Sequence, residues 1–149
     1  MYFVDRKAIE EKLSLLNEYL NFYKSKNEWT TFTDKLLLER IVHIIIESIL
    51  DVGNAIIDGF IMRDPGSYED IIAILLDEKV VSENNAGGLK NVITLRKMVV
   101  RDYTNVDHEE LDRVFLTNIE CLNNFSSSVQ EYLKNELGHV TAFKPDEGM

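Results

Sequence analysis

The segment over residues 36–62 constrains the fold of this chain more than any other. It is apolar on most sides, but polar side chains interrupt it at spacings of four, four, three and four: His43, Glu47, Asp51, Asn54 and Asp58. A membrane span needs about 20 mostly apolar residues with few charges, so the interruptions exclude one. These spacings place the polar groups on one face of a helix. A helix over residues 34–63 that is otherwise apolar is expected to be buried in a core or between subunits.

The rest of the chain also favours helices. It has only 7 Gly and 2 Pro in 149 residues, which argues against a turn-rich sheet fold. Apolar periodicity and capping residues predict further helices over residues 5–26, 68–78, 89–103 and 108–137, with Gly138 as the last cap. In the first of these, one face is apolar: Ile9, Leu13, Leu16, Leu20 and Tyr23. Ser67 with Asp70 and Asp107 with Glu110 have the spacing of capping boxes. The stretch over 82–88 is left unassigned. We expect an all-α, four- to five-helix up-and-down bundle in a single domain over residues 1–143, followed by a loose tail over residues 144–149.

The charge balance restricts the partners that the surface can attract. The formal charge is −10, so the surface as a whole repels nucleic acid, and RNA could bind only at a local cationic site. The single cysteine, Cys121, cannot form an internal disulfide, and the sequence shows no signal peptide. We therefore expect a cytoplasmic protein with no membrane association.

The row of polar groups from His43 to Asp58 has three possible interpretations. It could face solvent, or it could line a cleft or an interface between subunits, with His43, Glu47, Asp51 and Asn54 as its candidate residues. It could also hold a metal, because imidazole and carboxylates can ligate. No HExxH or CxxC pattern supports a metal site. We expect no metal and no cofactor.

A second candidate group closes the predicted helix over 89–103. It contains Arg96, Arg101 and Tyr103. The planar fork of arginine suits phosphate, but both arginines could instead pair with the abundant surface carboxylates. On an ideal α-helix Arg96 and Tyr103 point almost the same way, whereas Arg101 points away from both. Six residues separate Arg101 from His108, which is a weak pattern by itself.

Three segments resemble the HepT-like branch of the HEPN superfamily, most closely its YutE-type bacterial proteins. Residues 39–54 resemble the second helix of that family, residues 63–68 its turn into a short helix, and residues 95–107 its signature helix end. The similarity extends from the first helix to about Phe143. It implies a helical bundle that pairs as a homodimer, and many HEPN proteins are metal-independent endoribonucleases.

The resemblance also implies site residues. The family signature is an Arg, four to six residues, a His and, in this branch, a Tyr two residues later. Arg96 matches the Arg and Tyr103 matches the Tyr, but Arg101 stands where the His is expected. Arginine stays protonated at physiological pH, so Arg101 can bind phosphate but makes a poor base.

Two functions follow from this resemblance. The first is the HepT-like component of a toxin–antitoxin pair, an RNA-directed endoribonuclease-type dimer with weak activity. An MntA-like nucleotidyltransferase antitoxin would neutralise it by adding AMP to Tyr103. The second is a non-catalytic HEPN dimer that acts as a nucleotide- or RNA-binding or regulatory module. Because Arg101 makes a poor base, it favours the non-catalytic function. The extent of the family match favours the toxin component.

Overall fold

The computed structural model describes residues 4–137, and within them the chain forms helices and no strand. Three helices are long: α1 (Arg6–Ser25), α2 (Phe32–Gly59) and α6 (Ile119–Leu137). Three are short: α3 (Tyr68–Asp77), α4 (Glu83–Ile93) and α5 (His108–Thr117). A π-helical turn, η1 (Lys97–Arg101), follows α4. The expected all-α helical bundle is confirmed.

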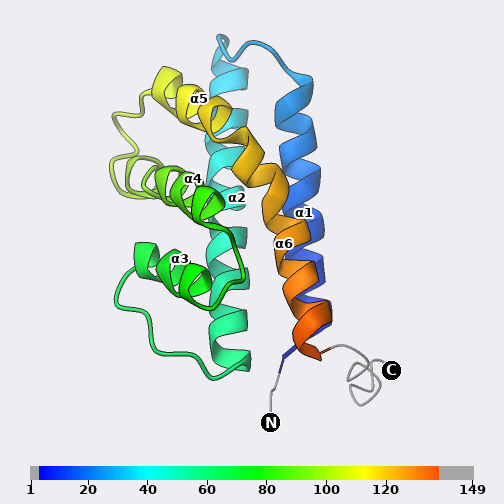
Figure 1. The fold of residues 1–149 in the computed structure, drawn as a ribbon. Helices are drawn as coiled ribbons and strands as arrows, with labels where there is room; N and C mark the ends of the chain where they lie inside the picture. The colour runs from blue at the N-terminus through cyan, green and yellow to red at the C-terminus, as the bar shows by residue number, and fades with distance from the viewer. Residues whose placement is uncertain (1–3, 138–149) are drawn as a thin grey trace.

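The short helices pack on the long ones. Helix α1 packs against α2 and α6 and runs antiparallel to both (Figure 1). Helix α3 packs on α2, α4 contacts α3, α5 and α6, and α2 also contacts α5 and η1. None of the helices in the described part of the chain is long and apolar enough to cross a membrane.

The core follows the apolar periodicity of the sequence. Helix α1 buries the face predicted for it, Ile9, Leu13, Leu16, Leu20 and Tyr23, each at most 2% exposed. Helix α2 buries a run of fully enclosed aliphatic side chains that includes Leu38, Val42, Ile45, Ile46 and Ile49. Each such side chain contributes about 1.5–3 kcal/mol relative to an exposed one, so α2 is the centre of the stabilising core.

A glycine on α2 sets the approach of α3. A Cβ atom on Gly53 would lie 2.6 Å from Cγ2 of Ile71, closer than real Cβ contacts. Ile71 is buried, with 3% of its surface exposed. The missing side chain therefore allows α3 to pack directly on α2, and this contact helps place Tyr68, the first residue of α3.

The predicted bounds of α2 are wrong at both ends. The helix begins at Phe32 rather than residue 34, because Thr31 caps it: its hydroxyl accepts from the Asp34 N–H at 3.1 Å, and the Asp34 carboxylate accepts from the Thr31 N–H at 3.3 Å. It ends at Gly59, four residues before the predicted end. Two residues later, Ile61 adopts a left-handed conformation with φ 58°, which an α-helix cannot contain.

Two later predicted helices are divided. Helix α4 starts at Glu83, because the Ser82 hydroxyl accepts from the Asn85 N–H at 3.2 Å, and it stops at Ile93 rather than continuing to residue 103. The predicted helix over 108–137 is interrupted at Asn118, whose side-chain amide donates to the Val114 carbonyl at 2.8 Å. Gly138 and the tail over residues 144–149 lie outside the described residues.

Candidate functional site

Contacts from two other helices fix the side chain of Arg96. Its Nε donates to Oε2 of Glu47 on α2 at 2.8 Å, and its guanidinium carbon lies 4.5 Å from the ring centroid of Tyr68 on α3. The hydrogen bond that Arg96 donates to Glu47 raises the pKa of Arg96 above its ordinary value, and burial opposes this only in part. Arg96 therefore stays charged and is held in one orientation.

The π-helical turn brings Arg101 to the same hollow as Arg96. The Asp102 N–H donates to the Lys97 carbonyl at 3.0 Å, so the hydrogen bond joins residues five apart. Five residues make about one turn of a π-helix, whereas they exceed one turn of an α-helix. Arg96 and Arg101 consequently line one hollow of about 480 Å³ together with Tyr68. The prediction that Arg101 points well away from Arg96 is wrong.

The two arginines differ in their surroundings. Arg96 pairs with Glu47, as the interpretation based on surface carboxylates predicts. Arg101 is exposed, and no carboxylate among residues 4–137 forms an ion pair with it. Its neighbour Lys97 is 79% exposed and lies 3.8 Å from Asp102. Arg96 is thus an anchored cation and Arg101 a cation available to an incoming anion.

Tyr103 lies in the turn after η1. It is 68% exposed, and within the described residues no hydrogen bond or ring contact joins it to Arg96 or Arg101. It is not among the residues that line the hollow. Its hydroxyl is therefore accessible from solvent at the edge of the candidate site.

The polar row on α2 extends one turn earlier than predicted, to Glu39, and it divides into two halves, from Glu39 to Glu47 and from Asp51 to Asp58. In the first half, His108 Nε2 of α5 lies 2.6 Å from Glu39 Oε2, and His43 Nε2 lies 4.0 Å from Glu47 Oε2. The second half consists of exposed side chains: Asp51, Asn54 and Asp58. Among residues 4–137 no three His, Cys, Asp or Glu side chains gather closely enough to hold a metal ion.

Two contributors to this site were missed from the sequence. Glu39 lies four residues before His43, so the helical period of the row already pointed to it. The sequence pointed to Tyr68 only indirectly, because Tyr68 directly follows the capping residue Ser67. The partner of Glu39, His108, was noted in the sequence but could not be connected with α2.

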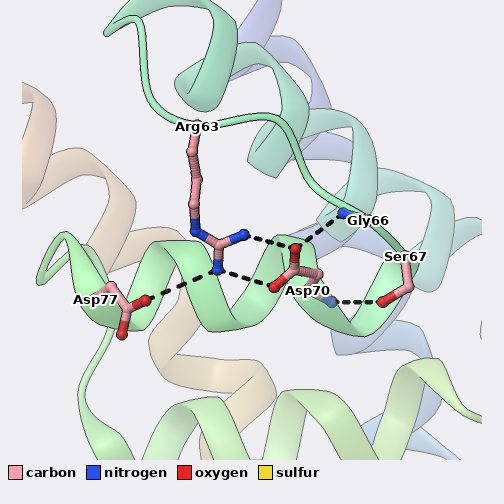
Figure 2. Close-up of polar contacts among 5 residues, drawn as sticks. All are labelled: Arg63, Gly66, Ser67, Asp70 and Asp77. Atoms are coloured by element: carbon pink, nitrogen blue, oxygen red, sulfur yellow. Dashed lines mark hydrogen bonds and ion pairs between the residues drawn. The ribbon is translucent and has the colours of Figure 1, made fainter.

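A cluster of polar contacts holds the connection that precedes Tyr68 (Figure 2). The two Nη atoms of Arg63 lie 2.7 and 2.9 Å from the Asp70 carboxylate, which also accepts from the Gly66 N–H at 2.8 Å. Ser67 accepts from the Asp70 N–H at 3.0 Å, so it caps α3 as predicted. The reciprocal contact of a capping box goes to Gly66 instead of Ser67. The Arg63 guanidinium, with help from Gly66, lowers the pKa of Asp70 to about 2.

Comparisons with known proteins show the family to which this chain belongs. The family model for HepT-like ribonucleases, described as "Ribonuclease HepT-like", matches residues 9–129. A protein of Bacillus subtilis (strain 168) named "Putative RNase YutE" is 47% identical over 144 residues, which cover 97% of this chain and all of that protein. A solved structure of YutE from Bacillus subtilis, described as a cytosolic protein, superposes with a TM-score of 0.91 at 46% identity. It covers 93% of this chain and 96% of that one.

More distant structures share the fold alone. A chain from a complex of a tri-AMPylated Shewanella oneidensis HEPN toxin with its MNT antitoxin gives a TM-score of 0.72 at 18% identity, covering 83% of this chain and 96% of that one. A chain from a toxin–antitoxin complex with AMP-PNP gives 0.70 at 17% identity, covering 81% and 96%. With the family model spanning most of the helical bundle and a relative at 47% identity over nearly the whole chain, this protein belongs to the HepT-like family.

Proposed function

We propose that this protein is the HepT-like component of a toxin–antitoxin pair: an RNA-directed homodimer with weak cleavage that a nucleotidyltransferase neutralises. The observation that carries the proposal is that one hollow is lined by Arg96, which Glu47 anchors, and by Arg101, which has no ion pair within residues 4–137. These two arginines occupy the positions of the Arg and the His of the HEPN signature.

The two arginines suit phosphate binding better than catalysis. With Nε bound to Glu47, the Nη atoms of Arg96 remain for a phosphate, and Arg101 can add a second charge-assisted contact. Both groups can stabilise negative charge that develops on a phosphate. Attack by a ribose hydroxyl also needs a group that exchanges a proton near neutral pH, and arginine cannot accept that proton. We therefore expect tight RNA binding and slow RNA cleavage.

RNA binding by full-length variants tests the phosphate site. Arg96→Ala should weaken binding of a short single-stranded RNA about tenfold or more, because a hydrogen bond to a charged group contributes about 1.5–3 kcal/mol. Arg113→Ala is the matched control, since Arg113 is exposed and pairs only with Glu110 within its own helix. If the two variants bound RNA with equal affinity, Arg96 would not be part of the phosphate-binding site.

Modification by a partner enzyme tests the regulatory half of the proposal. A nucleotidyltransferase encoded beside this protein, incubated with it and ATP, should add AMP to the exposed Tyr103. Tyr68→Phe is the matched control, because Tyr68 is also an exposed tyrosine, at 50%. Labelling that survives in Tyr103→Phe would place the acceptor elsewhere.

The homodimer has its own test. Light scattering at micromolar concentration should give twice the chain mass of 17.2 kDa. A dimer would bring a second copy of the Arg96 hollow into the assembly and would give the exposed half of the α2 row a partner. A monomer would contradict any site shared between subunits.

A second function is a non-catalytic HEPN dimer that binds nucleotide or RNA. The specific observation in its favour is that Arg101 stands where a proton-exchanging group is expected. The two functions differ in cleavage and in control by a nucleotidyltransferase. An absence of cleavage together with RNA binding that depends on Arg96 would select the second.

A further inference from the structure

The hollow beside Arg96 is built asymmetrically. The side formed by α4 and η1 carries three cations, Arg96, Lys97 and Arg101, whereas the side formed by α3 carries Tyr68 and Glu69. Its volume of about 480 Å³ is within the range of small-molecule sites, roughly 300–1,000 Å³. A ligand with a phosphate at one end and an uncharged body at the other matches this distribution, because Glu69 repels a phosphate from the α3 side.

Tyr68 supplies an aromatic surface on the α3 side. Arg96 lies against its ring, yet 50% of Tyr68 remains exposed. Ile93, which is buried, lines the same hollow and adds an apolar side chain to it. Nucleobases stack on exposed aromatic rings and on guanidinium planes without regard to sequence, because every base has a π-face.

The position of Tyr68 is fixed before any ligand arrives. Tyr68 follows the Ser67 cap directly, and the contacts of Arg63 and Gly66 with Asp70 hold the connection on its N-terminal side (Figure 2). Gly53 sets the close packing of α3 on α2. A ring held in this way loses little conformational freedom when a base stacks on it.

We infer that this hollow is a binding subsite for a ribonucleoside phosphate, with the phosphate at Arg96 and Arg101 and the base against Tyr68. The inference rests on the proposed function, which supplies the nucleotide as a residue of RNA. A free mononucleotide has the same chemistry and is the other source.

The test compares AMP with ribose 5-phosphate, which carries the same phosphate and sugar but no base. Each is titrated into the full-length protein, and the ratio of the two dissociation constants is measured by calorimetry or NMR. The expected ratio favours AMP by about fivefold or more, the effect of stacking on one aromatic ring. Tyr68→Leu should reduce the ratio to about one, whereas Tyr68→Phe should preserve it. Phe22→Leu, at another half-exposed aromatic residue, is the matched control and should change nothing.

The ratio of the two dissociation constants tests the base subsite separately from the phosphate site at Arg96. Binding of both compounds with equal affinity in the natural protein would overturn the base subsite and leave the role of Arg96 intact. Failure of both to bind, together with loss of RNA binding, would overturn subsite and function alike. Displacement of AMP by a four-residue RNA supports RNA as the source. AMP binding with the expected ratio but no displacement would confirm the subsite and assign it to a free nucleotide.

Discussion

The two halves of the polar row on α2 have the same sequence pattern and different environments. Glu39 and Glu47 in the first half each bind a cationic or imidazole group from an element far along the chain, Glu39 at His108 and Glu47 at Arg96. The second half, from Asp51 to Asp58, is exposed. Periodicity thus locates a face of a helix, but only the packing of distant elements decides which carboxylates acquire a role.

The sharpest test of this contrast replaces one carboxylate from each half by alanine and compares the two variants. Glu47→Ala should weaken binding of a short RNA about tenfold, because Arg96 loses the acceptor that orients it. Asp58→Ala, in the exposed half, should change the affinity less than twofold. Fluorescence anisotropy measures both.

A conservative variant shows whether Glu47 acts through Arg96. Glu47→Gln keeps a carbonyl oxygen that can accept from Nε, so it should restore most of the binding. The NMR signal of the Arg96 Nε–H group should shift in Glu47→Ala and change less in Glu47→Gln. An unshifted signal in Glu47→Ala would break the proposed connection.

The contact between Glu39 and His108 provides a second comparison, in stability. His108→Ala should lower the free energy of unfolding by about 1 kcal/mol, the typical net value of one hydrogen bond. Asn54→Ala should remain within about 0.5 kcal/mol of the natural protein, as for other exposed positions. Urea denaturation measures both, and equal changes would remove the distinction between the two halves.

A second copy of the chain could give the exposed half its partner. If Asp51 lies in the groove of the proposed dimer, Asp51→Leu should change dimerisation or stability by more than about 0.5 kcal/mol. Light scattering and urea denaturation would detect either change. If neither dimerisation nor stability changed, this half of the row would be an ordinary solvent-exposed face with no role in a dimer.

The smallest expected effect concerns Asp70, a partly buried carboxylate anchored by Arg63. Its pKa is lowered to about 2, so its contribution to stability is fully present above its ordinary pKa near 3.8 and is lost as the pH falls towards 2. The stability difference between the natural protein and Asp70→Asn should therefore be constant from pH 7 to about 4.5 and then shrink. NMR titration of the Asp70 carboxyl should give a midpoint near 2, and an ordinary midpoint would show that the Arg63 contact does not persist in solution.

The scaffold could be predicted from local patterns because its signals are local. The apolar period of residues 9–23 identified the buried face of α1, and capping residues located the starts of α3 and α5. Only the first half of helix α4 escaped prediction, because it contains Gly87 and Gly88, which are poor helix formers. A Cβ on Gly88 would collide with Cys121 of α6, so tertiary packing explains a residue that propensity disfavours.

The site could be predicted only in part. The pattern from Arg96 to Tyr103 and the polar row on α2 were both visible, but the bond between Arg96 and Glu47 joins residues 49 positions apart. The direction of Arg101 was predicted wrongly because α-helical geometry was assumed where the chain forms a π-helical turn. Tyr68 gained its importance from the packing of α3 against α2, which no local pattern records.

Cleavage of a short RNA by three matched proteins tests the central claim most directly. The natural protein should bind the RNA and cut it slowly, whereas Arg101→His should cut it faster, because general acid–base help typically contributes about 10²–10⁴-fold. Adding Arg96→Ala to Arg101→His should abolish the gain, since the phosphate would lose its anchored cation. Rapid cleavage by the natural protein, or a gain that persists without Arg96, would contradict the assignment of Arg96 and Arg101 as the phosphate-binding pair.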